Sequence, residues 1–167
     1  MSIAHSLLPE FDHEMAGLRR LLERIPGDRM DFRPHPKSFS LHELANHLAF
    51  VPRWATATME TTELEFSSPE VQAMRPTPAD SAAGLVKILD EGLPVARERL
   101  ASASDEAYLV PWSGKNGGKV LFTLPRIAVI RGMVLNHMIH HRAQATVYLR
   151  MLDVPVPALY GPSADEA

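Results

Sequence analysis

Two histidines lie one helical turn apart near the carboxyl end of the chain. His137 and His141 are four residues apart, so on an α-helix their side chains share one face, about 6 Å apart along the axis at roughly 1.5 Å per residue. Two imidazoles at this spacing can converge on one metal ion. The alternative is a pair of core histidines, whose ring nitrogens must then find hydrogen-bond partners within the protein.

The apolar stripe that contains these histidines extends along the whole predicted helix. At spacings of three and four residues its members are Ile127, Ile130, Val134, His137, His141, Gln144, Tyr148 and Met151. Other apolar residues of the same helix fall outside the stripe: Met133, Leu135, Met138 and Ile139. They are either covered within the monomer or buried against a partner, and we expect a homodimer with twofold symmetry. We expect Arg142 and Arg150 to be solvated or to pair with first-helix acids such as Asp12 or Glu14.

His47 is a third candidate ligand and belongs to a different helical segment. It lies three residues after Leu44 and four before Val51, at the border of an apolar stripe, so its ring can face the interior. Three histidines from two helices form a set that leaves metal positions open, as catalytic sites do. His42 and His47 are five residues apart and lack the His-Glu-x-x-His spacing of a zincin. His140 is expected to have a surface or supporting role.

The residues that would assist chemistry at this site are less sharply defined. Its catalytic residues stay unassigned, and three carboxylates are candidates for a general base: Asp12, Glu14 and Glu43. Trp54 lies two turns beyond His47, and Tyr148 lies two turns beyond His141. Each of these two aromatic residues is either part of the core or the wall of a pocket.

Four long segments with helical periodicity would position these residues. The apolar spacing predicts helices over about 3–25, 40–62, 79–104 and 123–153. Capping signals at Ser40–Glu43 and Thr77–Asp80 mark two of the starts, and Pro52 predicts a kink in the second helix. Residues 66–78 are expected to be a loop, and residues 105–122 are irregular or form a short hairpin. The pattern predicts an all-α fold, a four-helix bundle.

Length, composition and charge narrow the class of protein. With 167 residues the chain is the size of one domain, so we assign 1–167 to a single unit whose residues 158–167 form a surface tail. The absence of cysteine excludes disulfides, thiolate metal sites and a thiol nucleophile of its own. A formal net charge of −3 argues against a nucleic-acid partner. Without a signal-peptide pattern or a run of about 18 apolar residues, we expect a cytoplasmic protein with no membrane partner.

Several segments together resemble a known family. They are Ser40–Ala49 around His47, Leu135–Gln144 with its Asn-His-x-x-x-His-Arg core, Val147–Arg150, and the tail Val154–Pro162. This pattern, over about residues 5–164, is similar to that of the DinB-like superfamily. The resemblance implies an up-down-down-up four-helix bundle, usually a homodimer, that holds a divalent metal through residues matching His47, His137 and His141.

The resemblance also suggests an activity. Some members of the superfamily are metal-dependent transferases or isomerases that use bacillithiol or mycothiol. We therefore expect a divalent-metal-dependent enzyme that transfers a low-molecular-weight thiol to a small electrophile, or hydrolyses a small substrate. The alternative is a non-catalytic metal-binding stress-response dimer. Three imidazoles suit zinc, nickel, iron or copper; we expect zinc or nickel first, then iron or manganese, and no organic cofactor.

Overall fold

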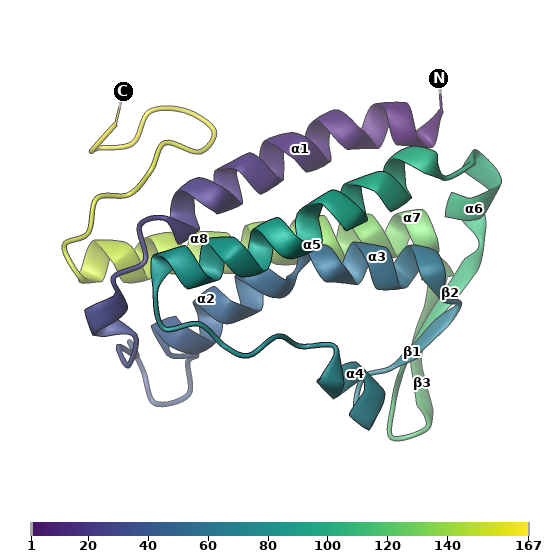
Figure 1. The fold of residues 1–167 in the computed structure, drawn as a ribbon, viewed down its shortest axis with the longest axis horizontal. Coiled ribbons are helices and arrows are strands. Elements are labelled where there is room, and N and C mark those ends of the chain that lie inside the picture. Colours follow the sequence, from purple (N-terminus) through teal and green to yellow (C-terminus); the bar gives the residue numbers. More distant parts are fainter. Residues whose placement is uncertain (1, 167) are drawn as a thin grey trace.

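The computed structural model describes residues 2–166, which form a mostly helical protein (Figure 1). Its long helical stretches are, in chain order, α1 (Ile3–Leu22); α2 (Leu41–Phe50) with α3 (Pro52–Glu60); α5 (Ala82–Ser102); and α7 (Arg126–Val129), the π-helical turn η2 (Ile130–Asn136) and α8 (His137–Met151). Shorter helices are η1 (Gly27–Arg29), α4 (Pro69–Ala73) and α6 (Asp105–Leu109). The four predicted helices correspond to the four long stretches, so the helical character is confirmed. Within residues 2–166, no helix has the length and apolar character needed to cross a membrane.

Serine side chains start half of these helices. In five of them the hydroxyl of the N-cap serine accepts a hydrogen bond from the backbone N–H three residues on; the caps are Ser2, Ser40, Ser68, Ser81 and Ser104. At α2, Glu43 completes the predicted capping box, because its carboxylate accepts from the Ser40 N–H at 2.7 Å. The predicted cap at Thr77–Asp80 is wrong, since α5 begins after Ser81.

The second helical stretch breaks at Pro52, as the sequence predicts. The Val51 N–H bonds to the Leu48 carbonyl at 3.2 Å, only three residues back. Pro52 then opens α3 at the first helical position, where its missing N–H costs no hydrogen bond. The break separates the helix that carries His47 from the helix that carries Trp54.

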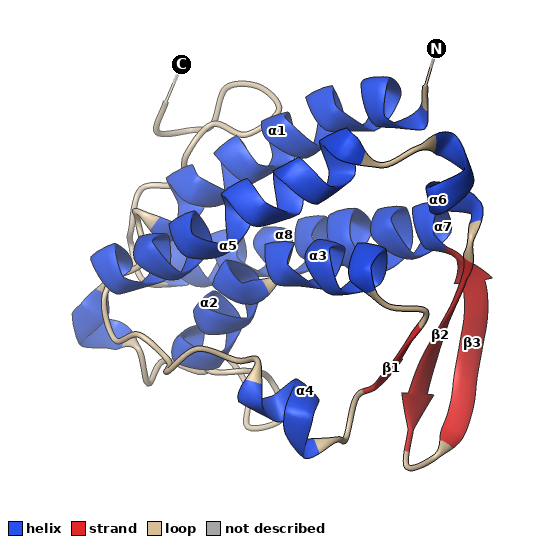
Figure 2. Cartoon of the chain, turned by 45° about the vertical axis from the view of Figure 1, so that its right-hand side comes forward, coloured by secondary structure: helices blue, strands red, loops and turns tan. Residues whose placement is uncertain are grey.

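A three-stranded sheet lies at one end of the helices, and it corrects the expectation of an all-α fold (Figure 2). Strand β1 (Glu63–Glu65) runs parallel to β2 (Pro111–Asn116), and β2 pairs antiparallel with β3 (Lys119–Pro125). The β2–β3 hairpin turns through Gly117 and Gly118, at φ of 58° and 76°, where a side chain would be strained.

Several predicted boundaries change because of this sheet. The hairpin alternative for residues 105–122 is confirmed, but β3 continues to Pro125, so the last helical stretch begins at Arg126 rather than near Thr123. Strand β1 takes the residues between the predicted second helix and the predicted loop 66–78, and α4 forms inside that loop. Short strands and a five-residue helix are too brief to impose a period on the sequence.

Two apolar clusters hold the elements together. The larger one fills the space between the long helices and includes Leu7, Phe11, Leu44, Leu48, Leu89, Val134 and Leu149. The smaller one lies between the sheet and the adjoining helices and consists of Ala57, Leu64, Val71, Trp112 and Val129. Trp54 packs against both clusters and therefore links the helical core to the sheet.

The buried face of the last helical stretch is displaced from the predicted stripe. Its buried members include Ile130, Val134, Leu135, Met138, Arg142, Ala145 and Leu149. Gln144 and Met151 are exposed instead, and His137 and His141 are half-buried. The wide π-helical turn changes the spacing at which residues share a face, and the pattern of threes and fours does not allow for it. Leu135 and Met138 are covered within the chain, so they no longer argue for a partner copy.

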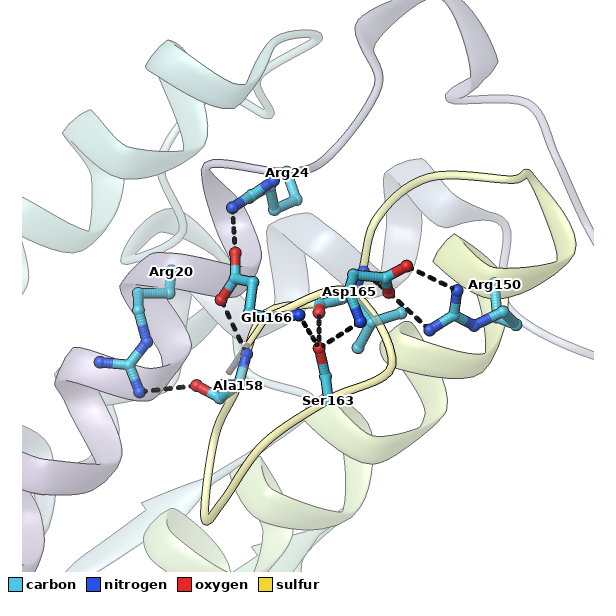
Figure 3. Close-up of polar contacts among 8 residues, drawn as sticks. Arg20, Arg24, Arg150, Ala158, Ser163, Asp165 and Glu166 are labelled. Carbon is cyan, nitrogen blue, oxygen red and sulfur yellow. Dashed lines mark hydrogen bonds and ion pairs between the residues drawn. The ribbon is translucent and has the colours of Figure 1, made fainter.

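The carboxyl-terminal tail folds back over the ends of α1 and α8 (Figure 3). The Asp165 carboxylate accepts two hydrogen bonds from the Arg150 guanidinium, at 3.2 and 2.6 Å. Glu166 pairs with Arg24 of α1, and the Ser163 hydroxyl accepts from the N–H groups of Asp165 and Glu166. Arg150 therefore pairs with the tail, and not with an acid of the first helix.

Candidate metal centre

Helices α2 and α8 bring the three predicted ligands together. His47 lies in the last turn of α2, and His137 and His141 lie in the first two turns of α8. Because α2 packs against α8, the three half-buried rings meet between the two helices. One ring nitrogen from each histidine lies within 4.8 Å of the other two.

The three rings face one another at short distances. Nε2 of His47 and Nε2 of His137 are 2.7 Å apart. The ring centroids of the three pairs lie 4.9, 4.8 and 4.5 Å apart. Two ring nitrogens this close require one donor and one acceptor, so the two rings cannot both direct an N–H at the contact. The arrangement directs one ring nitrogen of each histidine toward a common point.

The surroundings keep two of these imidazoles, His47 and His137, neutral. Burial, followed by the nearby charges of His137, His141 and Arg75, lowers the pKa of His47 from 6.5 to about 4. Burial and the neighbours His141 and His140 likewise lower the pKa of His137. A histidine binds a metal through an unprotonated nitrogen, so both rings are in the required form at neutral pH.

Gln144 orients the third ring. Its side-chain oxygen lies 2.8 Å from Nδ1 of His141, one helical turn before it. An amide oxygen only accepts, so Nδ1 carries the proton and Nε2 is left as the acceptor. A partner of this kind commonly fixes the tautomer of a metal-binding histidine. A set of three histidine nitrogens, one of them held by an outer partner, therefore fits a divalent metal ion.

The candidate general bases are occupied elsewhere. Asp12 accepts two hydrogen bonds from Arg97, each at 2.8 Å. Glu43 borders the site, but its carboxylate caps α2 and pairs with Arg33 at 3.0 Å. Glu14 is buried on the far side of α8. None of the three is therefore free to take a proton from a ligand at the histidines.

His47 lines two pockets of different character. The aromatic pocket, of about 210 Å³, is walled by Trp54, Phe66, Trp112, Phe122 and Met133, together with His47 and His137. The polar pocket, of about 510 Å³, is walled by Phe39, His42, Asn46, Arg75 and Pro76, together with His47. A ligand held at the histidines thus has an apolar space on one side and a polar space on another.

The two aromatic residues singled out from the sequence have different positions. Trp54 is a wall of the aromatic pocket, the second of its two expected roles. Tyr148 is buried, and its hydroxyl donates to the Phe39 carbonyl at 3.0 Å. It therefore holds the segment that carries Phe39, whose ring lies 6.0 Å from that of His141. His140 is exposed, as expected for a residue outside the trio.

Arg142, next to His141, points into the opposite side of α8. Its guanidinium donates to the Glu14 carbonyl at 2.9 Å and to the Glu14 carboxylate at 2.6 Å. It also bonds to the Tyr160 hydroxyl at 2.6 Å, and this hydroxyl donates to Glu14 at 2.9 Å. Gly17 leaves room for the arginine, because a Cβ there would lie 2.7 Å from its Nη1 atom. The expected pairing of Arg142 with a first-helix acid is correct for Glu14, but the pair is buried.

Sequence reasoning missed several residues of the site. Gln144 had a usable signal, since it lies three residues after His141 and therefore on a neighbouring face. The aromatic pocket gave a weaker one, because Phe66, Trp112 and Phe122 come from separate strand-bearing segments without a shared period. Arg75 gave none, since it lies in the connection after α4.

Comparison with known proteins agrees with this picture. The family described as "Mycothiol maleylpyruvate isomerase N-terminal domain" matches residues 11–143. No curated protein matches the chain.

Several solved structures have a similar fold, among them three from bacteria. A DinB-like protein from Bacillus cereus ATCC 10987 is 16% identical, with a TM-score of 0.72 over 95% of this chain and 98% of that one. A DinB-like protein from Bacillus subtilis is 16% identical, with a TM-score of 0.70 over 95% and 99%. A putative member of the DinB family from Exiguobacterium sibiricum 255-15 is 20% identical, with a TM-score of 0.68 over 95% and 97%. The chain therefore belongs to the mycothiol maleylpyruvate isomerase N-terminal domain family, within the DinB-like superfamily.

Proposed function

We propose that this protein is a divalent-metal-dependent enzyme that transfers a low-molecular-weight thiol to a small electrophile. The observation that carries the proposal is the meeting of His47, His137 and His141 where two pockets of different polarity share a wall. Three neutral nitrogens leave coordination positions for a substrate, as catalytic sites do. The family's description names mycothiol, which supports a thiol as the cosubstrate.

The proposed ligands are the three histidines, and the proposed ion is zinc or nickel, with iron or manganese next. When bound, such an ion is a Lewis acid that lowers the pKa of a coordinated thiol toward neutrality. The protein keeps its ligands ready for this role, because Gln144 orients His141 and burial keeps His47 and His137 unprotonated.

The polar pocket is the proposed place of the thiol cosubstrate. Such thiols carry hydroxyl, amide or carboxylate groups, and this pocket offers the cationic Arg75 together with the carboxylate of Glu43. Asn46 and His42 also line it, but the Asn46 amide bonds to the backbone of Ala79 and His42 pairs with Asp80. The positive charge of Arg75 reaches His47, since it contributes to the lowered pKa of that ring. An anionic or hydroxyl-rich thiol would therefore enter with its sulfur toward the histidines.

The transfer itself needs no nucleophile from the chain, which has no cysteine. The thiol loses its proton to solvent through the polar pocket, because the carboxylates of Asp12, Glu14 and Glu43 are engaged elsewhere. A sulfur lone pair then forms the S–C bond, and the leaving group of the electrophile departs with the electrons of the broken bond. In the nearest alternative, hydrolysis, water takes the place of the thiol.

We also propose that the long helices form the up-down-down-up bundle of the superfamily, and that two copies of the chain associate as a homodimer in the cytoplasm. The likeness of fold to the DinB-like structures supports the bundle. The exposed Met133, Val147 and Met151 leave apolar surface on the last helical stretch for a partner. Light scattering tests the dimer, and a mass near the 18.5 kDa of one chain would contradict it.

The activity is tested with protein purified without a histidine tag. Elemental analysis should find one divalent ion per chain, and a screen of mycothiol, bacillithiol and glutathione with small electrophiles should give turnover that needs both ion and thiol. Chelation should abolish turnover and leave the helical circular dichroism unchanged.

Three other outcomes would overturn parts of the proposal. Turnover without thiol would indicate a hydrolase. A fully metallated protein that is inert with thiols, electrophiles and esters would favour a non-catalytic metal-binding protein. Loss of helical structure on chelation would make the site structural.

A further inference from the structure

We infer that the aromatic pocket binds a planar, apolar group about the size of one aromatic ring, and that this group belongs to the electrophile. The inference rests on the proposed function, because it names the chemical class of the second substrate. Four observations support it: the aromatic walls of the pocket, the hydrogen bonds that two of its lining groups already make, its volume, and its position beside the histidines.

The walls of the pocket form a connected series of aromatic faces. The ring of Trp54 lies 6.1 Å from that of Phe66, which lies 6.4 Å from that of Trp112. The Phe122 ring follows at 6.0 Å from Trp112. Aromatic rings at 4.5–7 Å interact favourably in tilted or offset arrangements, so a further planar ring can join this series through its face or its edge.

Two of the polar groups in these walls are already bonded within the protein. The Trp112 indole N–H donates to the Thr61 hydroxyl at 3.0 Å. The hydroxyl of Thr58, another lining residue, donates to the Trp54 carbonyl at 2.8 Å. These two groups therefore offer a ligand no free hydrogen-bond donor, and burying a ligand's own polar groups against the aromatic rings would cost free energy. Its polar end must therefore point toward His47 and His137, where the reaction would take place.

The size of the pocket limits the group that fits. A cavity of about 150 Å³ lined by apolar side chains holds benzene, and this pocket measures about 210 Å³. One ring with a short substituent fits that space, whereas a nucleotide exceeds it. Gly114 of β2 maintains the shape, because a Cβ there would lie 2.7 Å from the Phe122 ring and 3.0 Å from the Phe66 ring.

The inference is tested by saturation-transfer NMR with two neutral alcohols of matched shape, benzyl alcohol and cyclohexylmethanol. The purified protein is used both as isolated and after chelation. Benzyl alcohol should bind saturably in both forms and at least several-fold more tightly than cyclohexylmethanol. Trp54 and Trp112 are the two tryptophans of the chain, and both line the pocket, so their fluorescence should change along the same titration.

Two pairs of variants locate the binding. Phe122→Ala removes one aromatic wall and should weaken benzyl alcohol binding about tenfold, whereas Leu121→Ala, on the adjacent exposed position of β3, should not change it. Met133→Trp fills the pocket at a residue that is 41% exposed and should abolish binding. Its control is Met151→Trp, at a residue 55% exposed on α8 outside the pocket.

The outcomes separate this inference from the proposed function. Absence of saturable binding, equal affinity for the two alcohols, or unchanged binding in both Phe122→Ala and Met133→Trp would overturn the inference, whether or not the protein is active. Inertness toward electrophiles with normal benzyl alcohol binding would overturn the catalytic role alone. In an active preparation, benzyl alcohol should raise the KM for the electrophile and leave kcat unchanged.

Discussion

Two neighbouring residues of α8, His141 and Arg142, take part in clusters of opposite design on the two sides of the helix. Behind α8, Arg142 meets Glu14 and Tyr160, so charge and hydrogen-bonding groups are matched within the protein. In front of it, His141 meets two more histidines, and like groups face one another. A cluster in which donors meet acceptors and opposite charges meet stabilises the fold. A cluster of like groups needs a partner from outside the protein, such as a ligand. This contrast is the physical basis for placing a ligand at the histidines.

The largest effect is expected from removing one of the three histidines proposed to bind the metal. His47→Ala, His137→Ala or His141→Ala should each lower metal affinity roughly 100-fold or more, since loss of even an outer partner costs 10–100-fold. His140→Ala, one residue from the cluster and exposed, should retain the metal. Elemental analysis and competition with a chelator measure both. Loss of metal in His140→Ala but not in His141→Ala would show that the wrong histidine was chosen.

A large loss of stability is expected from the same kind of change behind the helix. Arg142→Ala leaves the Glu14 carboxylate buried without its cation and should lower the free energy of unfolding by about 3–5 kcal/mol. Arg97→Ala breaks the exposed pair with Asp12, which solvent screens, and should leave the free energy of unfolding nearly unchanged. Urea unfolding of both variants measures the difference. Equal effects would remove the distinction between the clusters.

The metal-free protein should lose stability in mild acid because a histidine of the cluster becomes protonated. The His47 ring protonates near pH 6.5 in the unfolded chain but near pH 4 in the folded one, so the unfolded state takes up the proton first as the pH falls. This contribution to stability is complete above pH 6.5, declines below it and is lost near pH 4, with a total of up to about 3 kcal/mol. Urea unfolding of chelated protein across this range measures it. His47→Gln should show a shallower dependence, and an identical slope would contradict the assignment.

The smallest effect is expected at Gln144. This residue gives the histidine cluster one hydrogen-bond partner from within the protein, as Glu14 and Tyr160 do for Arg142. Gln144→Ala should lower metal affinity about 10–100-fold by releasing the His141 ring. Gln144→Glu keeps an acceptor at the same place and should bind the metal as well as the parent chain does. Isothermal titration with zinc compares the three proteins. Equal weakening in both variants would mean that Gln144 does not act through its acceptor oxygen.

The sequence contained enough information for the helices and for the three histidines, because both depend on local spacing. The step of four from His137 to His141 survives any change in the surroundings, and the Ser40–Glu43 capping box forms as predicted. The inward face of the last helix was predicted less well. The stripe was extended through residues 130–136 at α-helical spacing, whereas η2 occupies that stretch.

The remainder depended on contacts between distant segments. The aromatic pocket joins Trp54 of α3 to Trp112 of β2, and no local pattern predicts that these residues meet. The burial of Arg142 also escaped prediction, because an arginine in a helix is usually exposed and its cover comes from Gly17 and Tyr160 at opposite ends of the chain.

The π-helical turn η2 divides the last helical stretch into two segments, and it rotates the side chains of one segment about the helix axis relative to those of the other. A π-bulge commonly represents one additional residue in an α-helix, and each residue of an α-helix turns the chain by about 100°. Val129 before the turn and Met133 within it wall the aromatic pocket, while His137 follows immediately after it. Deleting one residue here, such as Gly132, would rotate the pocket wall away from the histidines. Every side chain that lines the pocket or the metal centre would still be present in the sequence. The geometry of the reaction centre is therefore encoded in part by chain length, and an alignment of relatives should place a one-residue gap at this turn wherever the pocket and the histidines are oriented differently.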